Sequence, residues 1–414
     1  MMEEERYQQP PQLRDIFTLI DEMEPQLLQD FKAMLRIPAI APVSGGDGEG
    51  KKAKFLLQLL GSMEFDEVRV LEAQDTVPRP NIIAVKHGID RSQRMWIMCH
   101  MDVVPPGDLS KWDTDPFDPI VKEGKIFARG TEDNGQELMA SMYALKALQK
   151  LGITPAMDIG LLLVSDEETG SEFGIRYLVK EGIFRKDDLI IVPDAGNVDA
   201  TELEIAEKSI LWLKVTTNGI QTHGSTPHRG INAMVAGMMF GSRASRELKS
   251  SYSGENPLFN PPISTFEPTK KESNVPNVNT IPGEDIFYMD CRILPGIDPD
   301  QVIEHLKSIA SEVEQETGAT IGLKIVQKEV AAPPTPEDAP VVKLLTNAVK
   351  RVWKNEPKAI GIGGGTCAAI LRRAGYEAVV WGRIDEVAHG PNEYCRIENV
   401  MGDTKVYALL FTGL

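Results

Sequence analysis

Several features are scarce in these 414 residues, and each scarcity narrows the possible functions. Cysteine occurs only at Cys99, Cys291, Cys367 and Cys395, without a Cys-x-x-Cys spacing, which argues against a zinc ribbon or a dense disulfide framework. No apolar run approaches the ~18 residues of a membrane span, and the start of the chain lacks the basic and apolar regions of a secretion signal. We therefore expect a cytoplasmic protein with reduced thiols.

Positive charge is also scarce. Lysine and arginine number 44 against 61 aspartates and glutamates, a net charge of −17 that repels nucleic acid and anionic membranes. The length, with 42% apolar and 25% charged residues, excludes collagen-like, coiled-coil and wholly disordered chains and permits a sizeable core. Two domains fit best, although three domains, or one large unit with an insertion, remain open.

The first half of the chain alternates short apolar strands with helices. The first ~30 residues are polar, with a Pro10-Pro11 break, and a helix follows at about 24–35. A longer helix is expected from Asp133 to Leu151. Strands are expected at 81–85, 95–99, 157–164 and 189–192. Such alternation indicates an α/β fold with a mostly parallel sheet.

The pattern changes near Ser209. Strands are expected at 211–216, 264–267, 285–292 and 321–326, and helices at 231–248 and 299–314. This order, βαββαβ, is typical of a small ferredoxin-like sheet with helices on one face. We predict an inserted domain at 209–328 between two parts of a catalytic domain, 1–208 and 329–414. The proline-rich segment 331–336 is a plausible hinge.

Polar residues follow the ends of three predicted strands. They are His100 and Asp102, then Asp166, Glu167 and Glu168, and finally Asp194. Ligands in open α/β sheets bind outside the carboxyl ends of the strands, so these groups should converge on one crevice. Asp133, at the predicted helix start, and His389, in a late loop, could join them. Taken singly, each could instead be a helix cap, a solvated loop residue or a structural histidine.

Two histidines and three carboxylates form a donor set that suits zinc, or cobalt and manganese at lower affinity. Two metals could be held if one carboxylate bridged them. Glu167 and Glu168 cannot point the same way on extended chain, so one could bind metal while the other acts as general base on a polarised water. Asp102, two residues after His100, could orient the imidazole.

Three further features could contact a substrate. His223, in the segment 221–228, could stabilise an oxyanion, or could be an ordinary loop histidine. The turn at Gly363, Gly364, Gly365 and Thr366 leads into a predicted helix and lacks the lysine of a nucleotide-binding loop, which favours a substrate carboxylate. Arg292 could pair with a carboxylate or form a salt bridge within its strand.

These motifs resemble the dinuclear zinc amidohydrolases and exopeptidases that include carboxypeptidase G, acetylornithine deacetylase, succinyl-diaminopimelate desuccinylase, aminoacylase-1 and carnosinase-type dipeptidases. The likeness covers nearly the whole chain. It rests on motifs that begin at His100, Gly130, Asp166 and Ala388, read as His100-Met101-Asp102, Gly130-Thr131-Glu132-Asp133, Asp166-Glu167-Glu168 and Ala388-His389-Gly390-Pro391-Asn392-Glu393, with Asp194 between the last two.

The resemblance implies roles for these residues. One zinc would lie between His100 and Asp194 and the other between Glu168 and His389, with Asp133 as the bridge. Glu167 would be the general base and Asp102 the group that orients His100. The inserted domain would be a lid that forms a homodimer, and His223 would reach the partner's active site. Asn279 and Arg292 match positions near the substrate's carboxylate.

Two departures leave the subfamily open. The family commonly has Met-Lys-Gly or Asp-Lys-Gly after the bridging aspartate, whereas Asn134-Gly135-Gln136 stands here. Position 194 is aspartate, where many deacylases have glutamate. We therefore expect a two-metal hydrolase of an amide next to a free carboxylate, acting on a dipeptide or N-acyl amino acid. A dedicated desuccinylase or acetylornithine deacetylase, a single-metal or redox enzyme and a non-catalytic binding protein with this fold are the alternatives.

Overall fold

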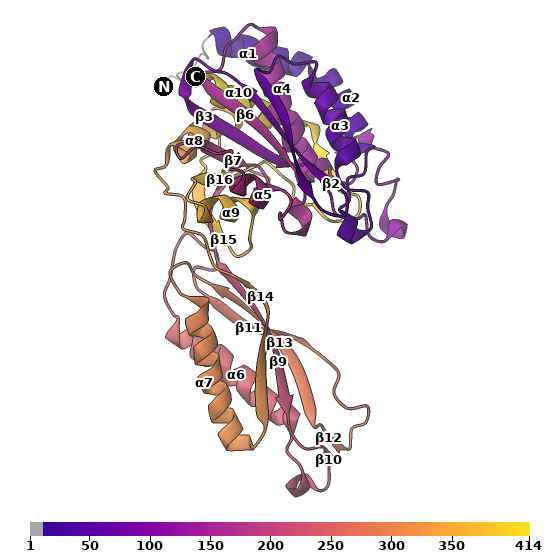
Figure 1. Ribbon diagram of the computed structural model, residues 1–414, viewed down its shortest axis with the longest axis vertical. Coiled ribbons are helices and arrows are strands. Elements are labelled where there is room, and N and C mark those ends of the chain that lie inside the picture. The colour runs from indigo at the N-terminus through magenta and orange to yellow at the C-terminus, as the bar shows by residue number, and fades with distance from the viewer. Residues whose placement is uncertain (1–10) are drawn as a thin grey trace, which may run out of the picture. The chain divides into compact units, whose positions relative to one another are not determined.

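The computed structural model describes residues 11–414, which form two compact units (Figure 1). The larger unit comprises residues 11–205, 335–359 and 370–414, and the smaller unit comprises residues 206–334 and 360–369. Residues 1–10, where the predicted first domain begins, lie outside the described residues. The smaller unit takes in the glycine-rich segment, which the predicted inserted domain does not contain.

The helices are α1 (Pro11–Glu22), α2 (Glu24–Leu35), α3 (Gly50–Leu60), α4 (Gln136–Lys150), α5 (Ile175–Lys180), α6 (Ala233–Ser251), α7 (Pro299–Thr317), α8 (Pro340–Trp353), α9 (Cys367–Arg373) and α10 (Ile397–Thr412). The strands are β1 (Glu67–Gln74), β2 (Pro78–Lys86), β3 (Asp90–His100), β4 (Ile120–Lys122), β5 (Lys125–Phe127), β6 (Met157–Val164), β7 (Leu189–Val192), β8 (Glu202–Glu207), β9 (Ser209–Asn218), β10 (Thr222–His223), β11 (Thr265–Lys271), β12 (Thr280–Ile281), β13 (Glu284–Ile293), β14 (Thr320–Glu329), β15 (Lys358–Ile362), β16 (Ala378–Val380) and β17 (Tyr394–Arg396).

The large sheet has the strand order β1-β2-β6-β3-β7-β16-β8-β15. Its centre, β6-β3-β7-β16, is parallel, whereas β2 pairs antiparallel with β6 and β1 pairs antiparallel with β2. All eight residues of β6 are buried, as expected of a strand covered on both faces. Gly160 of β6 pairs with Trp96 of β3, and a side chain at 160 would meet the buried indole ring. The α/β prediction with a mostly parallel sheet is confirmed.

The parallel strands end at one edge of the sheet. His100, the last residue of β3, pairs with Val164, the last residue of β6, and β7 ends at Val192 beside them. The residues that follow these strands therefore leave the sheet together, as expected of a site at the carboxyl ends of parallel strands.

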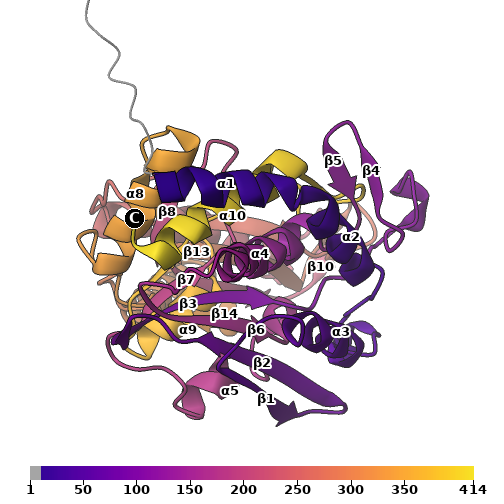
Figure 2. The same ribbon diagram turned by 90° about the horizontal axis from the view of Figure 1, so that it is seen from above.

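Helices cover this sheet, and Figure 2 shows α1, α10 and α4 lying over one face of it. Helix α1 was not predicted, because Pro10-Pro11 suggested a break. Leu13, Ile16 and Ile20 nevertheless recur at helical spacing and are buried. None of the helices within residues 11–414 combines the length and apolar character needed to cross a membrane.

The smaller unit contains an antiparallel sheet in the order β11-β13-β9-β14. Helices α6 and α7 lie on one face of it (Figure 1). Alternate residues of β9 and β13, such as Leu213 and Met289, are buried against these helices, while their neighbours are more exposed. The element order is the predicted βαββαβ, with a short added pair, β10 and β12.

Candidate metal centre

Five predicted ligands meet at the carboxyl edge of the large sheet, all in the larger unit. They form two groups that share Asp133, namely His100, Asp133 and Asp194, and Asp133, Glu168 and His389. Within each group one ligand atom of every residue lies within 4.8 Å of the others. The sequence prediction placed these five residues together, and the structure does so.

The distances show how Asp133 joins the groups. His100 Nε2 is 2.7 Å from Asp133 Oδ1 and 3.2 Å from Asp194 Oδ1. His389 Nε2 is 2.9 Å from Asp133 Oδ2 and 3.1 Å from Glu168 Oε2. One carboxylate thus faces a different imidazole with each oxygen, the arrangement that a bridging ligand requires. Imidazole nitrogen and carboxylate oxygen are donors that suit zinc and similar divalent cations, so the residues present fit a metal.

Charge also favours cations here. Burial alone would lower the pKa of His100, but the charge of Asp133 and the hydrogen bonds to the neighbouring aspartates together outweigh it and raise that pKa well above its usual range. Hydrogen bonds to Asp133 and Glu168 raise the pKa of His389 to about 10. Burial, followed by the charge of Asp194, raises the pKa of Glu167 well above its usual range. In the metal-free protein the excess of carboxylates is therefore balanced by protons, which a divalent cation can replace.

Glu167 and Glu168 lie in a short turn, Glu167–Thr169, directly after β6. The two neighbours lie against different groups: the charge of Asp194 acts on Glu167, whereas Glu168 bonds to His389. The turn is held by the fully buried carboxylate of Asp102, which accepts the backbone N–H of Glu167 at 3.1 Å and that of Glu168 at 3.0 Å.

The contact between Asp102 and His100 is made through the backbone. The Nδ1 atom of His100 lies 2.9 Å from the Asp102 carbonyl oxygen and 3.6 Å from its carboxylate Oδ1. Only the shorter distance is a hydrogen bond. It leaves Nε2 of His100 directed at Asp133 and Asp194.

A buried ion network also stabilises the turn that carries Glu167 and Glu168, through the preceding residue, Asp166. Arg79 donates to Glu49 at 2.7 and 2.8 Å and to Asp166 at 3.2 Å, and all three side chains are buried. Asp166 has a left-handed backbone, φ 66°, and its carboxylate also accepts the N–H of Phe173 at 3.0 Å. Arg79 of β2 and Glu49, which directly precedes α3, are not among the residues predicted from the sequence.

The segment around Asp133 is not the predicted helix start. Helix α4 begins at Gln136, and Asp133 has extended dihedral angles, φ −113° and ψ 96°. The Asn134 side chain donates to the carbonyl of Pro193, and Glu393 accepts the N–H of Asp133, so both hold the backbone out of the helix.

Position 135, where the family commonly has lysine, has no room for a side chain. A Cβ at Gly135 would lie 2.4 Å from the Gly130 oxygen and 2.8 Å from the Phe31 ring. The packing of this turn therefore excludes a lysine at position 135.

The remaining predicted residues lie in the smaller unit. His223 lies on β10 opposite Thr280 of β12, with its Nε2 3.4 Å from Asn279 Nδ2 and its Nδ1 2.7 Å from the Ser225 hydroxyl. The structure thus brings His223 and Asn279 together. Arg292 donates to both carboxylate oxygens of Asp290, at 2.6 and 3.0 Å, so it forms the salt bridge that the sequence left open.

Arg292 also donates to the carbonyl of Gly363 at 2.7 Å, which ties the glycine-rich segment to β13. Gly364 and Gly365 have room for a Cβ, and the Thr366 hydroxyl donates to Glu207 at 2.7 Å. The helix that follows, α9, has only seven residues.

Comparison with known proteins agrees with this geometry. The family model described as peptidase family M20/M25/M40 matches residues 96–412. An uncharacterized metallohydrolase of Methanococcus maripaludis is 38% identical over 399 residues, covering 90% of this chain and 95% of that protein. A succinyl-diaminopimelate desuccinylase of Nautilia profundicola is 25% identical over 375 residues, covering 89% of this chain and 94% of that protein.

The same fold occurs in the crystal structure of aminopeptidase PepT from Bacillus cereus, with a TM-score of 0.75 at 17% identity over 94% of this chain and 98% of that one. The resemblance seen in the sequence is thereby confirmed. This chain belongs to peptidase family M20/M25/M40 and is a metal-dependent hydrolase of peptide or amide bonds.

Proposed function

We propose that the chain uses two zinc ions to hydrolyse an amide bond next to a free carboxylate, in a dipeptide or an N-acyl amino acid. The observation that carries this proposal is the shared Asp133, whose two oxygens face His100 and His389 at 2.7 and 2.9 Å. His100 and Asp194 would hold one ion, Glu168 and His389 the other, and Asp133 both. Cobalt or manganese could substitute.

The metal would polarise the scissile carbonyl and lower the pKa of a water. Glu167 is not one of the proposed ligands, so its carboxylate, beside the group of His100, Asp133 and Asp194, would be available for proton transfer. It would take a proton from the attacking water and deliver it to the nitrogen of the leaving amine, so that water and amide become carboxylate and amine. Burial raises the pKa of Glu167, which suits a group that must both accept and return a proton.

Zinc analysis together with two glutamine variants tests this assignment. Loaded protein should hold two ions per chain, and Asp133→Ala should lower that number. Glu167→Gln should keep both ions and lose ~10²-fold or more in kcat, whereas the matched Glu168→Gln should loosen one ion. Saturation at one ion that Asp133→Ala leaves unchanged, or equal loss of metal in both glutamine variants, would contradict the proposal.

The substrate class can be tested directly with N-acetyl-ornithine, N-succinyl-diaminopimelate, N-acyl amino acids and dipeptides, each with added zinc or cobalt. The similarity to a succinyl-diaminopimelate desuccinylase makes desuccinylation the second candidate. A preference for N-succinyl-diaminopimelate over all dipeptides would select it. Arg292, Asn279, Gly364, Gly365 and Thr366 are the residues we propose to contact the substrate's carboxylate.

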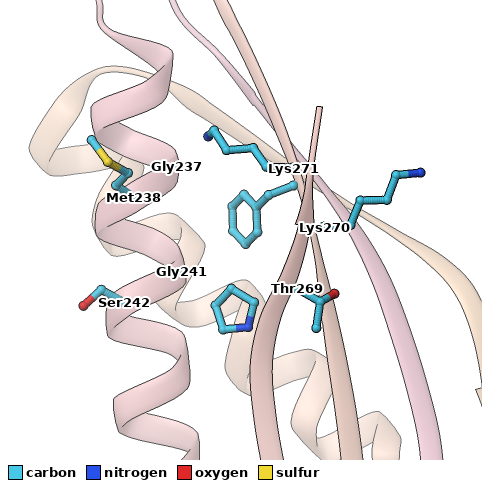
Figure 3. Close-up of a pocket in the computed structure, with 9 residues that line it drawn as sticks. Gly237, Met238, Gly241, Ser242, Thr269, Lys270 and Lys271 are labelled. Carbon is cyan, nitrogen blue, oxygen red and sulfur yellow. The ribbon is translucent and has the colours of Figure 1, made fainter. Parts of the chain in front are cut away.

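We further propose that residues 209–328 act as a lid and pair two chains. Strand β11 is an edge strand, bonded only to β13 among the described strands. Beside it lies a hollow of about 280 Å³, which Gly237, Met238 and Gly241 of α6 and Thr269 of β11 line (Figure 3). A Cβ at Gly241 would meet the Phe287 ring at 3.2 Å. Met238, on the rim of the hollow, is half exposed. A two-fold pairing of this face with its copy would cover both the strand edge and this apolar surface.

In such a dimer His223 would serve the partner's active site as an oxyanion donor, and its alanine variant should lose ~10²-fold or more in kcat with both metals retained. Mixing inactive His223→Ala and Glu167→Gln chains should restore activity, because heterodimers contain one site with both groups. No recovery after verified subunit exchange would mean that His223 acts within its own chain or has no catalytic role. The four buried free cysteines support our expectation that the enzyme works in the cytoplasm.

A further inference from the structure

Two acids that belong to neither ligand group connect the segments that carry Asp133 and His389. The first is Glu132, which is buried and directly precedes Asp133. Its carboxylate accepts three backbone N–H groups from the segment before His389, those of Asp385 at 2.7 Å, Val387 at 2.6 Å and Ala388 at 3.2 Å. A residue next to one ligand thus holds the backbone that leads to another.

The second acid, Glu393, makes the reverse connection. It follows His389 by four residues and is fully buried. Its carboxylate accepts the backbone N–H groups of Gly130 at 3.1 Å, Glu132 at 3.0 Å and Asp133 at 3.2 Å. Arg129 supplies the counter-charge to Glu393 and donates to the carbonyl of His389 at 3.1 Å.

Both segments depend on these contacts for their shape. Residues 385–392 contain no helix or strand, and Asp133 lies where helical geometry is interrupted. Backbone groups outside regular structure need other partners when they are buried. Hydrogen bonds to a carboxylate are among the strong ones, and they also offset the cost of burying its charge.

We infer that Glu132 and Glu393 are positioning residues that form a reciprocal clasp and set the separation of Asp133 and His389. The clasp would thereby preform the metal site of Asp133, Glu168 and His389. This inference rests on the proposed two-metal function. Every bond of the Glu132 carboxylate described above goes to the segment before His389, so loss of that carboxylate should affect the His389 site and spare the site of His100 and Asp194.

Substitution of Glu132 gives a graded test. In Glu132→Gln one carboxylate oxygen becomes an NH₂ group, which cannot accept an N–H, so part of the clasp remains. In Glu132→Ala all three acceptor contacts are lost. The readout is zinc affinity, measured for each of the two binding steps by competition with a chromophoric chelator. Partners behind metal ligands typically contribute 10–100-fold to affinity.

We expect Glu132→Ala to weaken one zinc step about 10–100-fold, with Glu132→Gln intermediate and the other step unchanged. In a His389→Ala background, which lacks the affected site, Glu132→Ala should have no further effect on zinc binding. The control is Asp158→Asn, which alters a buried acid near the start of β6, the end opposite the metal centre. It should leave both zinc steps intact even where it lowers stability.

The outcomes separate this inference from the proposed function. If the unaltered chain binds only one zinc ion, the two-metal proposal fails whatever the variants do. If it binds two and Glu132→Ala binds both as tightly, or weakens both steps equally, the clasp has no selective role and the inference is wrong. Should Glu132→Ala fail to fold, Glu132→Gln carries the same comparison.

Discussion

Asp102→Asn is the substitution that best separates two roles for one buried carboxylate. The family resemblance makes Asp102 the group that orients His100, whereas the structure shows its carboxylate accepting the N–H groups of Glu167 and Glu168. The asparagine has nearly the same shape, but only one of its two terminal atoms accepts a hydrogen bond. One N–H of the turn would therefore face an NH₂ group.

The magnitude follows from that single lost acceptor. A hydrogen bond to a charged group contributes about 1.5–3 kcal/mol, and an unpaired N–H costs about 1–3 kcal/mol. We expect the metal-free protein to lose about 2 kcal/mol of unfolding free energy in urea. The general base lies in this turn, and a displacement of about 1 Å in a catalytic group can cost ~10²-fold, so kcat should fall on that scale.

Zinc affinity discriminates between the two roles. His100 bonds to the carbonyl oxygen of Asp102, which the substitution keeps, so zinc binding by the His100 group should change little. Asp158→Asn again serves as the control, because that buried carboxylate accepts the N–H of Gly88 far from the turn. If zinc affinity collapses while stability and kcat per bound metal are unchanged, the carboxylate acts through His100 and our reasoning is refuted.

Four further outcomes are expected. Because the pKa of His389 is raised to about 10, its imidazole keeps a proton that zinc must displace. The apparent zinc affinity should therefore rise with pH, up to tenfold per unit from pH 6 to 9, and a chelator titration that shows no pH dependence would contradict this. The same raised pKa stabilises the metal-free fold below about pH 6.5, and this contribution disappears as pH rises through 10, which urea unfolding at several pH values can follow. Arg79→Met leaves buried carboxylates without their counter-ion and should cost about 3–5 kcal/mol in urea, with a loss below 1 kcal/mol as the contrary result. Gly135→Ala forces a Cβ to within 2.4 Å of a carbonyl oxygen and should cost about 1–3 kcal/mol in the same assay, and an unchanged midpoint would show that the turn can yield.

The strand ends were predictable because parallel strands share a direction. Apolar runs that end at His100, before Asp166 and before Asp194 predict that these polar residues lie at one sheet edge. The βαββαβ order of the smaller unit followed in the same way from its alternating periods. The predicted start of α4 at Asp133 was wrong, because the non-helical backbone at Asp133 depends on a hydrogen bond to Glu393, which is distant in sequence.

Contacts between distant loops leave no periodic signal, and this limited the site prediction. Glu132 and the segment 385–388 are separated by about 250 positions, and nothing in either stretch encodes their approach. The carboxylate of Asp102 was expected to orient an imidazole, because a pattern of two residues shows proximity but cannot show which backbone N–H groups lie nearby. Helix α1 was missed because Pro11, which suggested a break, stands at its first position, where proline is tolerated.

The residues on either side of Asp133 also restrict which substitutions this turn can accept. Glu132 holds the segment before His389, Asn134 holds the carbonyl of Pro193 next to Asp194, and Gly135 fits only because it has no side chain. Replacing Asn134-Gly135 with Met-Lys would therefore remove the bond to the loop at Pro193 and clash with the Phe31 ring at once, and a change at Glu132 would disturb the loop before His389. Substitutions here should be tolerated only in combination with changes in those loops, so chimeras must exchange the contacting segments as a set.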